Sequence, residues 1–223
     1  MAHQRSVFDI IGPVMIGPSS SHTAGAVRLG GLARAIFGGQ PTSAEIVLHG
    51  SFASTGTGHG TDLALVAGLL GMTPDDSRIP DAFAEAEDAG LSVFFTSDDL
   101  GEVHPNTAML TLRGPDGHEM LVQGCSVGGG DVLVTRIGDY DVEVTGELPV
   151  LVVAHHDQPG VIAGVTAVLA AESVNVASME VSRERRGASA LMIIEIDNPI
   201  GEGSLQELRK VAGVTGVRTV PAV

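Results

Sequence analysis

The 223-residue sequence contains one cysteine, one tyrosine and no tryptophan, and these scarcities exclude several kinds of protein. The single thiol, Cys125, cannot form a disulfide within the chain. Aromatic residues make up only 3%, so the core must be built from Val, Leu, Ile and Ala. Basic residues number 12 against 27 acidic ones, for a formal charge of −15. Because nucleic-acid binding needs a basic face and only the short Arg183–Arg186 cluster offers one, no nucleic-acid partner is expected.

Long apolar runs are also missing. None reaches the roughly 18–20 residues that span a bilayer, so no membrane association is expected. The opening segment, MAHQRSVFDIIGPVMIGP, lacks the long apolar stretch and small-residue cleavage site of a signal peptide, which predicts a cytoplasmic location. With 43% hydrophobic and 17% charged residues, the composition is that of a globular, core-forming chain.

The apolar pattern predicts an α+β protein with a boundary near Gly146. In the first part, residues 1–146, we expect an extended start, a helix over 24–37 stopped by Gly38-Gly39, a strand over 44–53, a glycine-rich loop over 54–62, helices over 63–72 and 81–90, and then successive strands. In the second part, residues 148–223, strands are predicted over 148–156, 175–185, 188–197 and 214–220, and helices over 157–174 and 204–213. That βαββαβ order is ferredoxin-like.

The stretch PSSSHT, just before the first predicted helix, has more hydroxyls than a helix start needs. One serine suffices to cap the free backbone N–H groups, which is the purely structural interpretation. The start of a helix also attracts a carboxylate through its dipole and unpaired donors. Ser19, Ser20, Ser21 and Thr23 add hydroxyl donors, and His22 can exchange a proton near neutral pH. The stretch is therefore a candidate substrate site.

Two further stretches are polar enough to take part in such a site. STGTGHGTD (54–62) offers hydroxyls, including Thr57, three glycines and His59 at the mouth of a helix; its structural interpretation is a flexible loop. It lacks the Gly-Lys-Ser/Thr ending of a phosphate-binding Walker loop. HPNTA (104–108) carries His104 and Asn106, which either hydrogen-bond a substrate or only shape a turn.

Residues 148–223 resemble an ACT domain in their element order and in the turn HHDQPGVIAGV. Gly160 lets the backbone approach a ligand closely, and either Asp157 or Gln158 is expected to cap the helix. The resemblance implies a small effector, often an amino acid, bound by Asp157, Pro159, Gly160 and Val161. The alternative is that the domain only dimerises. ACT domains often pair edge to edge, so a homodimer through this domain is expected.

The first part resembles the beta subunit of bacterial iron–sulfur-dependent L-serine dehydratase. The resemblance is carried by SVFDIIGPVMIGPSSSHTAGAVRLGGLAR, by LHGSFASTGTGHGTDLALVAGLLGM (48–72) and by HPNTA, in that order. It implies a lyase, L-serine ammonia-lyase, that eliminates water from L-serine to give pyruvate and ammonia. A 4Fe-4S cluster acts there as Lewis acid on the serine hydroxyl, and in two-chain enzymes an alpha subunit carries it.

The thiol count bears on that implication. A cubane cluster needs three or four thiolate ligands and this chain has one Cys, so no metal is expected on it. Either a partner alpha subunit supplies the cluster, as the resemblance implies, or this chain is not catalytic. His22 and His59 become the catalytic candidates, and Ser19, Ser20, Ser21, Thr23, Thr57, His104 and Asn106 the substrate-binding ones.

Two alternatives stay open. The first part is also similar to the allosteric substrate-binding domain of some phosphoglycerate dehydrogenases, so SSSHT serves either an active site shared with the alpha subunit or a regulatory anion site. The alternative to the lyase subunit is a stand-alone serine or anion sensor without catalysis.

Overall fold

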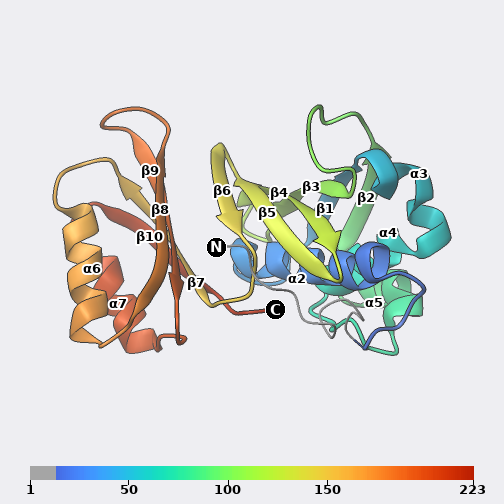
Figure 1. The fold of residues 1–223 in the computed structure, drawn as a ribbon, viewed down its shortest axis with the longest axis horizontal. Coiled ribbons are helices and arrows are strands. Elements are labelled where there is room, and N and C mark those ends of the chain that lie inside the picture. The colour runs from blue at the N-terminus through green and yellow to red at the C-terminus, as the bar shows by residue number, and fades with distance from the viewer. Residues whose placement is uncertain (1–13) are drawn as a thin grey trace. The chain divides into compact units, whose positions relative to one another are not determined.

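The computed structural model describes residues 14–223, apart from the side chain of Thr57. The extended start expected over residues 1–13 lies outside the described residues. The chain divides into two compact units, Met1–Thr135 and Arg136–Val223 (Figure 1). The six-stranded sheet runs on to β6 (Tyr140–Val144), shortly before Gly146. The domain boundary expected near Gly146 stays a prediction.

The six-stranded sheet has the order β2-β1-β3-β4-β5-β6. At one end β1 (Ser43–Leu48) pairs in parallel with β2 (Ser92–Ser97), and on its other side it pairs antiparallel with β3 (Thr107–Arg113). The next strands are β4 (Glu119–Gly128) and β5 (Asp131–Ile137). The inward residues of this sheet, such as Ile46 on β1, Leu110 on β3 and Val122 on β4, are fully or almost fully buried. This is the aliphatic core that the scarcity of aromatics predicts.

Two helices of the first unit cross at unusually short range. α2 (Gly25–Phe37) follows a π-helical turn, η1 (Ser20–Ala24), and ends at the left-handed Gly38, as the Gly-Gly pair predicts. α4 (Thr61–Leu69) packs against it with Gly30 facing Gly68. A Cβ on Gly68 would overlap the carbonyl oxygen of Val27, so the two backbones touch directly.

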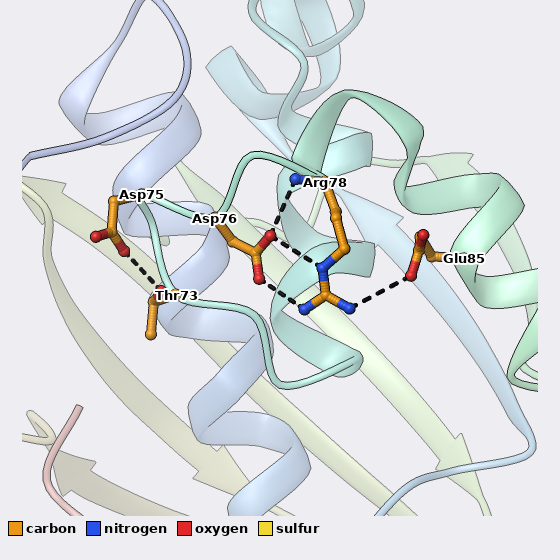
Figure 2. A network of polar contacts seen from close by, with 5 residues as sticks. All are labelled: Thr73, Asp75, Asp76, Arg78 and Glu85. Carbon is orange, nitrogen blue, oxygen red and sulfur yellow. Dashed lines mark hydrogen bonds and ion pairs between the residues drawn. The ribbon is translucent and has the colours of Figure 1, made fainter.

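The segment after α4 is held by a small polar network (Figure 2). Asp76 accepts from the Arg78 side chain at 2.7 and 3.1 Å, and Arg78 also reaches Glu85 on α5 (Ala82–Asp88) at 3.5 Å. These bonds from Arg78 lower the pKa of Asp76 to about 2. Beside them Thr73 donates to Asp75 at 2.6 Å. The network orders the connection through η2 (Ile79–Asp81) into α5.

The strand expected over 44–53 is confirmed for 44–48 and wrong for 49–53, and the loop expected over 54–62 is wrong. β1 ends at Leu48, and the segment after it is a helix, α3 (Gly50–His59), closed by the left-handed Gly60. The N–H of Ser51 donates to the carbonyl of Pro105 at 2.7 Å, and Phe52 is completely buried. These tertiary contacts outweigh the low helix propensity of the glycines.

Gly58→Ala tests whether this glycine-rich segment is a helix. A Cβ at Gly58 meets nothing within 4 Å, so alanine should raise the free energy of unfolding by up to about 1 kcal/mol through its higher helix propensity. The matched control is Gly60→Ala, which should lower it by about 1–2 kcal/mol because Gly60 has φ 66°. Urea denaturation measures both. A destabilising Gly58→Ala would contradict a helix here.

The second unit contains the predicted βαββαβ order: β7 (Val150–His156), α6 (Val161–Ala171), β8 (Val176–Arg183), β9 (Ser189–Ile196), α7 (Glu202–Lys210) and β10 (Val214–Val220). Its strands pair antiparallel in the order β10-β7-β9-β8. Both helices pack their apolar residues, Val165 and Leu208 among them, on the sheet residues Val153 and Met192. The predicted α+β fold class is confirmed. Among the helices of residues 14–223, none combines the length and apolar character that crossing a bilayer requires.

Candidate active site

The turn η1 places the hydroxyl-rich stretch at the start of α2. Ser19 caps it: its Oγ accepts from the His22 backbone N–H at 3.1 Å. Ser20 and Ser21 are half-buried on the turn. Thr23 is buried, and its hydroxyl donates to the His59 carbonyl at 3.2 Å. One serine therefore has the capping role, and Thr23 ties the turn to the end of α3.

His22 lies against two hydroxyls of α3. Its Nε2 is 3.0 Å from the Oγ of Ser51 and 3.1 Å from the Oγ1 of Thr55. Thr55 donates its one hydroxyl proton to the Ser51 carbonyl at 2.8 Å, so its oxygen accepts at His22. This arrangement favours the neutral His22 tautomer that has its proton on Nε2 and its lone pair on Nδ1.

The surroundings keep His22 neutral. Its ring stands edge-on to the buried Phe52, with centroids 5.3 Å apart, and beside His59 at 5.1 Å. Burial first, and then the charge of His59, lower the pKa of His22 below 6.5, against a smaller opposing effect of hydrogen bonding to the Ser51 backbone. Near pH 7 the imidazole is therefore a proton acceptor. His59 donates through Nδ1 to the Thr55 carbonyl at 3.1 Å, which fixes its ring on the same helix.

The HPNTA loop reaches this cluster through its backbone. The Pro105 carbonyl holds the N-terminus of α3 by accepting from Ser51. The exposed His104 accepts from the N–H of Asn106 at 3.1 Å within its own turn, and the Asn106 side chain donates to the Ser126 carbonyl on β4 at 3.3 Å. Thr57 lies on α3, with its side chain outside the described part of the structure. The structure thus brings His22, Thr23 and His59 together and places the loop beside them.

The sequence patterns do not single out three residues of this cluster: Ser51 and Phe52, which precede the stretch 54–62, and Thr55 within it. Ser51, Thr55 and His59 are spaced four residues apart, which is the spacing of one helix face. The glycines at positions 50, 56, 58 and 60 hid that signal, because they favoured a loop.

Removing the hydroxyl at Ser51 should perturb His22 specifically. Ser51→Ala takes away a hydrogen-bond partner of Nε2, so we expect a fall in kcat of roughly tenfold and a shift in the acid limb of the rate profile. Ser54→Ala, four residues before Gly58 on the exposed side of α3, is the matched control and should behave as wild type. Steady-state kinetics of L-serine dehydration against pH, on the complex with the alpha subunit that the resemblance implies, measures both. Equal profiles for the two variants would contradict this role for Ser51.

The turn before α6 differs from the expected cap. α6 begins after Gly160, which has φ 95° and provides no side-chain cap, so neither Asp157 nor Gln158 caps the helix. Asp157 accepts instead from the Gly187 N–H at 2.9 Å and from Arg183 at 3.1 Å. Pro159 is exposed and Val161 is buried at the start of the helix. The carboxylate thus anchors the β8–β9 loop.

This anchoring predicts a pH dependence. The Gly187 N–H first, and Arg183 second, lower the pKa of Asp157 below 3.8. A carboxyl with a depressed folded-state pKa contributes stability above its unfolded pKa and loses it as the pH falls through the folded one. Wild type and Asp157→Asn should therefore differ in Tm at pH 7 and converge as the pH falls below about 4. A Tm difference that does not change with pH would contradict this role.

The donor set of the chain does not fit an iron–sulfur cluster. Such clusters need several thiolates, and Cys125 is the one thiol in the sequence. It is buried in β4, and burial raises its pKa, which opposes the thiolate form. Within residues 14–223, no three His, Cys, Asp or Glu side chains gather as metal ligands would.

The fold and site define a class: a protein with a histidine–hydroxyl site in an α/β unit, followed by a ferredoxin-like unit. Residues 6–91 match the family described as serine dehydratase beta chain, and residues 150–213 match the ACT domain. The chain is 46% identical, over 97% of its length and 98% of the relative's, to the "Probable L-serine dehydratase, beta chain" of Bacillus subtilis. It is 40% identical to the "L-serine dehydratase, beta chain" of Peptoniphilus asaccharolyticus, covering 88% and 89% of the two chains.

This chain belongs to the serine dehydratase beta chain family, and its second unit is an ACT domain. The family resemblance seen in the three sequence motifs is confirmed. The chain is also 28% identical to a D-3-phosphoglycerate dehydrogenase of Synechocystis. That match covers 87% of this chain and 35% of the relative.

Proposed function

We propose that this chain is the beta subunit of a two-chain L-serine dehydratase and that it supplies one half of the active site. The observation that carries the proposal is the neutral His22 held against Ser51 and Thr55 at the start of α2. Elimination needs a base for the proton on Cα of serine, and Nδ1 of His22 is suited to take it. The pair of electrons left by that proton forms the new double bond as the hydroxyl leaves.

The helix start is suited to the substrate carboxylate. Ser20 and Ser21 lie on the turn where backbone N–H groups and the helix dipole favour a negative charge. The proposed substrate-binding set is completed by Ser19, Thr23, Thr57, His104 and Asn106. His59 is the second proposed catalytic histidine. The support for these roles is that α3 and the HPNTA loop, which carry those of these residues that are distant in sequence from His22, contact the segment that carries His22 or contact each other.

The proposed partner is an alpha subunit that would hold the 4Fe-4S cluster, and the cluster would supply a Lewis acid for the serine hydroxyl. The support is the thiol count: the one buried Cys125 does not fit a cluster, and the relatives at 46% and 40% identity are named beta chains. The isolated chain should have no visible absorption and release no pyruvate from L-serine. Tight binding of L-serine by the isolated chain, with no turnover in the presence of an alpha subunit, would support a stand-alone sensor instead.

The ACT domain is proposed to regulate the enzyme in the cytoplasm. Asp157, Pro159, Gly160 and Val161 form the proposed effector site, supported by the left-handed Gly160, where no side chain obstructs the backbone. Edge pairing of ACT domains would make the chain a homodimer. Light scattering on the eluting protein measures this, and a monomer at every concentration would contradict it.

A further inference from the structure

The outer edge of β2 is open for pairing. Within residues 14–223, β2 is the end strand of its sheet, and β1 is its hydrogen-bonded neighbour. The N–H groups of Ser92 and Asp98 donate toward β1, to Thr42 and Leu48. Because alternate residues of a strand bond to the same neighbour, the N–H groups of Val93, Phe95 and Ser97 point outward. An edge of this kind accepts an added strand.

Phenylalanines flank this edge on both faces of the sheet. Phe94 is 62% exposed on one face. On the other face Phe83 of α5 is 44% exposed and stands edge-on to Phe95, with centroids 6.2 Å apart. Half of the six phenylalanines in the sequence thus gather at one strand edge. An added strand with alternating apolar side chains would cover both aromatic surfaces.

The segments on either side of β2 in the sequence are rich in acidic residues. Residues 75–106 contain nine Asp and Glu residues and one basic residue, Arg78, which is already paired with Asp76 and Glu85. Exposed acids lie on both sides of β2, including Glu87 and Asp88 before it and Asp98 and Asp99 after it. A second copy of this chain would bring the same charges against themselves. These acidic residues therefore favour a basic partner, because opposite charges attract across an interface.

The same strand shares a cavity with α3. Phe95, Thr96 and Ser97 line a cavity of about 170 Å³ together with Phe52. Phe52 is also the ring that stands against His22. A partner strand on the edge of β2 would thus pair with the strand whose side chains share this cavity with Phe52.

We propose that the outer edge of β2, with Phe83 and Phe94 beside it, is the docking surface for a basic, apolar strand of the partner subunit. The proposal rests on the proposed function, which requires a second chain to carry the thiolates. It adds where that chain binds and which surface chemistry it presents.

The test measures the Kd between the full-length chain and the alpha subunit, prepared without oxygen. Phe94→Arg places a positive charge where a basic strand docks, and Ser97→Pro removes an outward N–H without touching the pairing with β1. Each should raise Kd at least tenfold. Ile162→Arg, at a 47%-exposed residue of α6, is the matched control and should bind as wild type. Circular dichroism and Tm verify that each variant is folded.

Raising the salt from about 0.05 to about 0.5 M should also slow association several-fold, because the contact is charge-complementary. If the wild-type chain forms an active complex and both edge variants bind with unchanged Kd, the docking surface is wrong and the proposed function still stands. No complex and no turnover with wild type would overturn both. Self-association of the isolated chain that Phe94→Arg abolishes and Ile162→Arg does not would mean that a second copy covers the edge, which also overturns the proposal.

Discussion

His22→Ala in the assembled enzyme is expected to lower kcat for pyruvate release at least about 100-fold, the range that loss of a general base produces. The variant removes the imidazole that Ser51 and Thr55 hold, and no other described ring of the cluster occupies the same position. His118→Ala, at an exposed histidine that stacks on Phe37 far along the chain, is the matched control and should keep full turnover.

The pH profile gives a second check on the same residue. As the base is active when neutral, the wild-type rate should fall only as the pH drops through the lowered pKa of His22, below the ordinary 6.5. The residual rate of His22→Ala should lack this limb. If His22→Ala keeps full turnover and its rate falls at low pH as in wild type, His22 is not the base.

Gly68→Ala is expected to destabilise the first unit by about 3 kcal/mol or more. The new methyl would overlap the backbone of α2 at Val27, and neither helix can give way without moving its buried side chains. Gly31→Ala is the matched control: its Cβ would meet only an ordinary contact with Gly68, so its higher helix propensity should leave stability unchanged or raise it by up to about 1 kcal/mol.

Chemical denaturation followed by circular dichroism measures the two variants. Because the clash is confined to α2 and α4, the loss should fall on the transition of the first unit. Equal stability for Gly68→Ala and Gly31→Ala would contradict the direct backbone contact of the two helices.

The sequence predicts the fold best where one strong local pattern decides it. The apolar spacing of Val27, Leu29, Leu32 and Ile36 and the Gly-Gly stop were sufficient to predict the first helix. The second unit was predicted in full element order, because its strands are β-branched and its turns carry Gly or Pro. In both cases the local preference and the packing agree.

α3 was not predictable in the same way. Its glycines indicate a loop, and the contacts that make it a helix lie far away in the chain: the Pro105 carbonyl at its start and the core around Phe52. The site depends on that helix. The sequence identifies His22 and His59 individually as candidates. It does not predict that they lie close together beside the hydroxyls of Ser51 and Thr55, because that arrangement requires residues 50–59 to be helical.

The measurement that tests the central claim most directly is reconstitution without oxygen. The purified alpha subunit is titrated with this chain, and pyruvate release from L-serine is followed. If this chain supplies half of the active site, neither chain alone releases pyruvate, activity rises to a stoichiometric plateau with wild type, and His22→Ala forms the complex without restoring the rate. Full activity of the alpha subunit alone, with no change on adding this chain, would contradict the account.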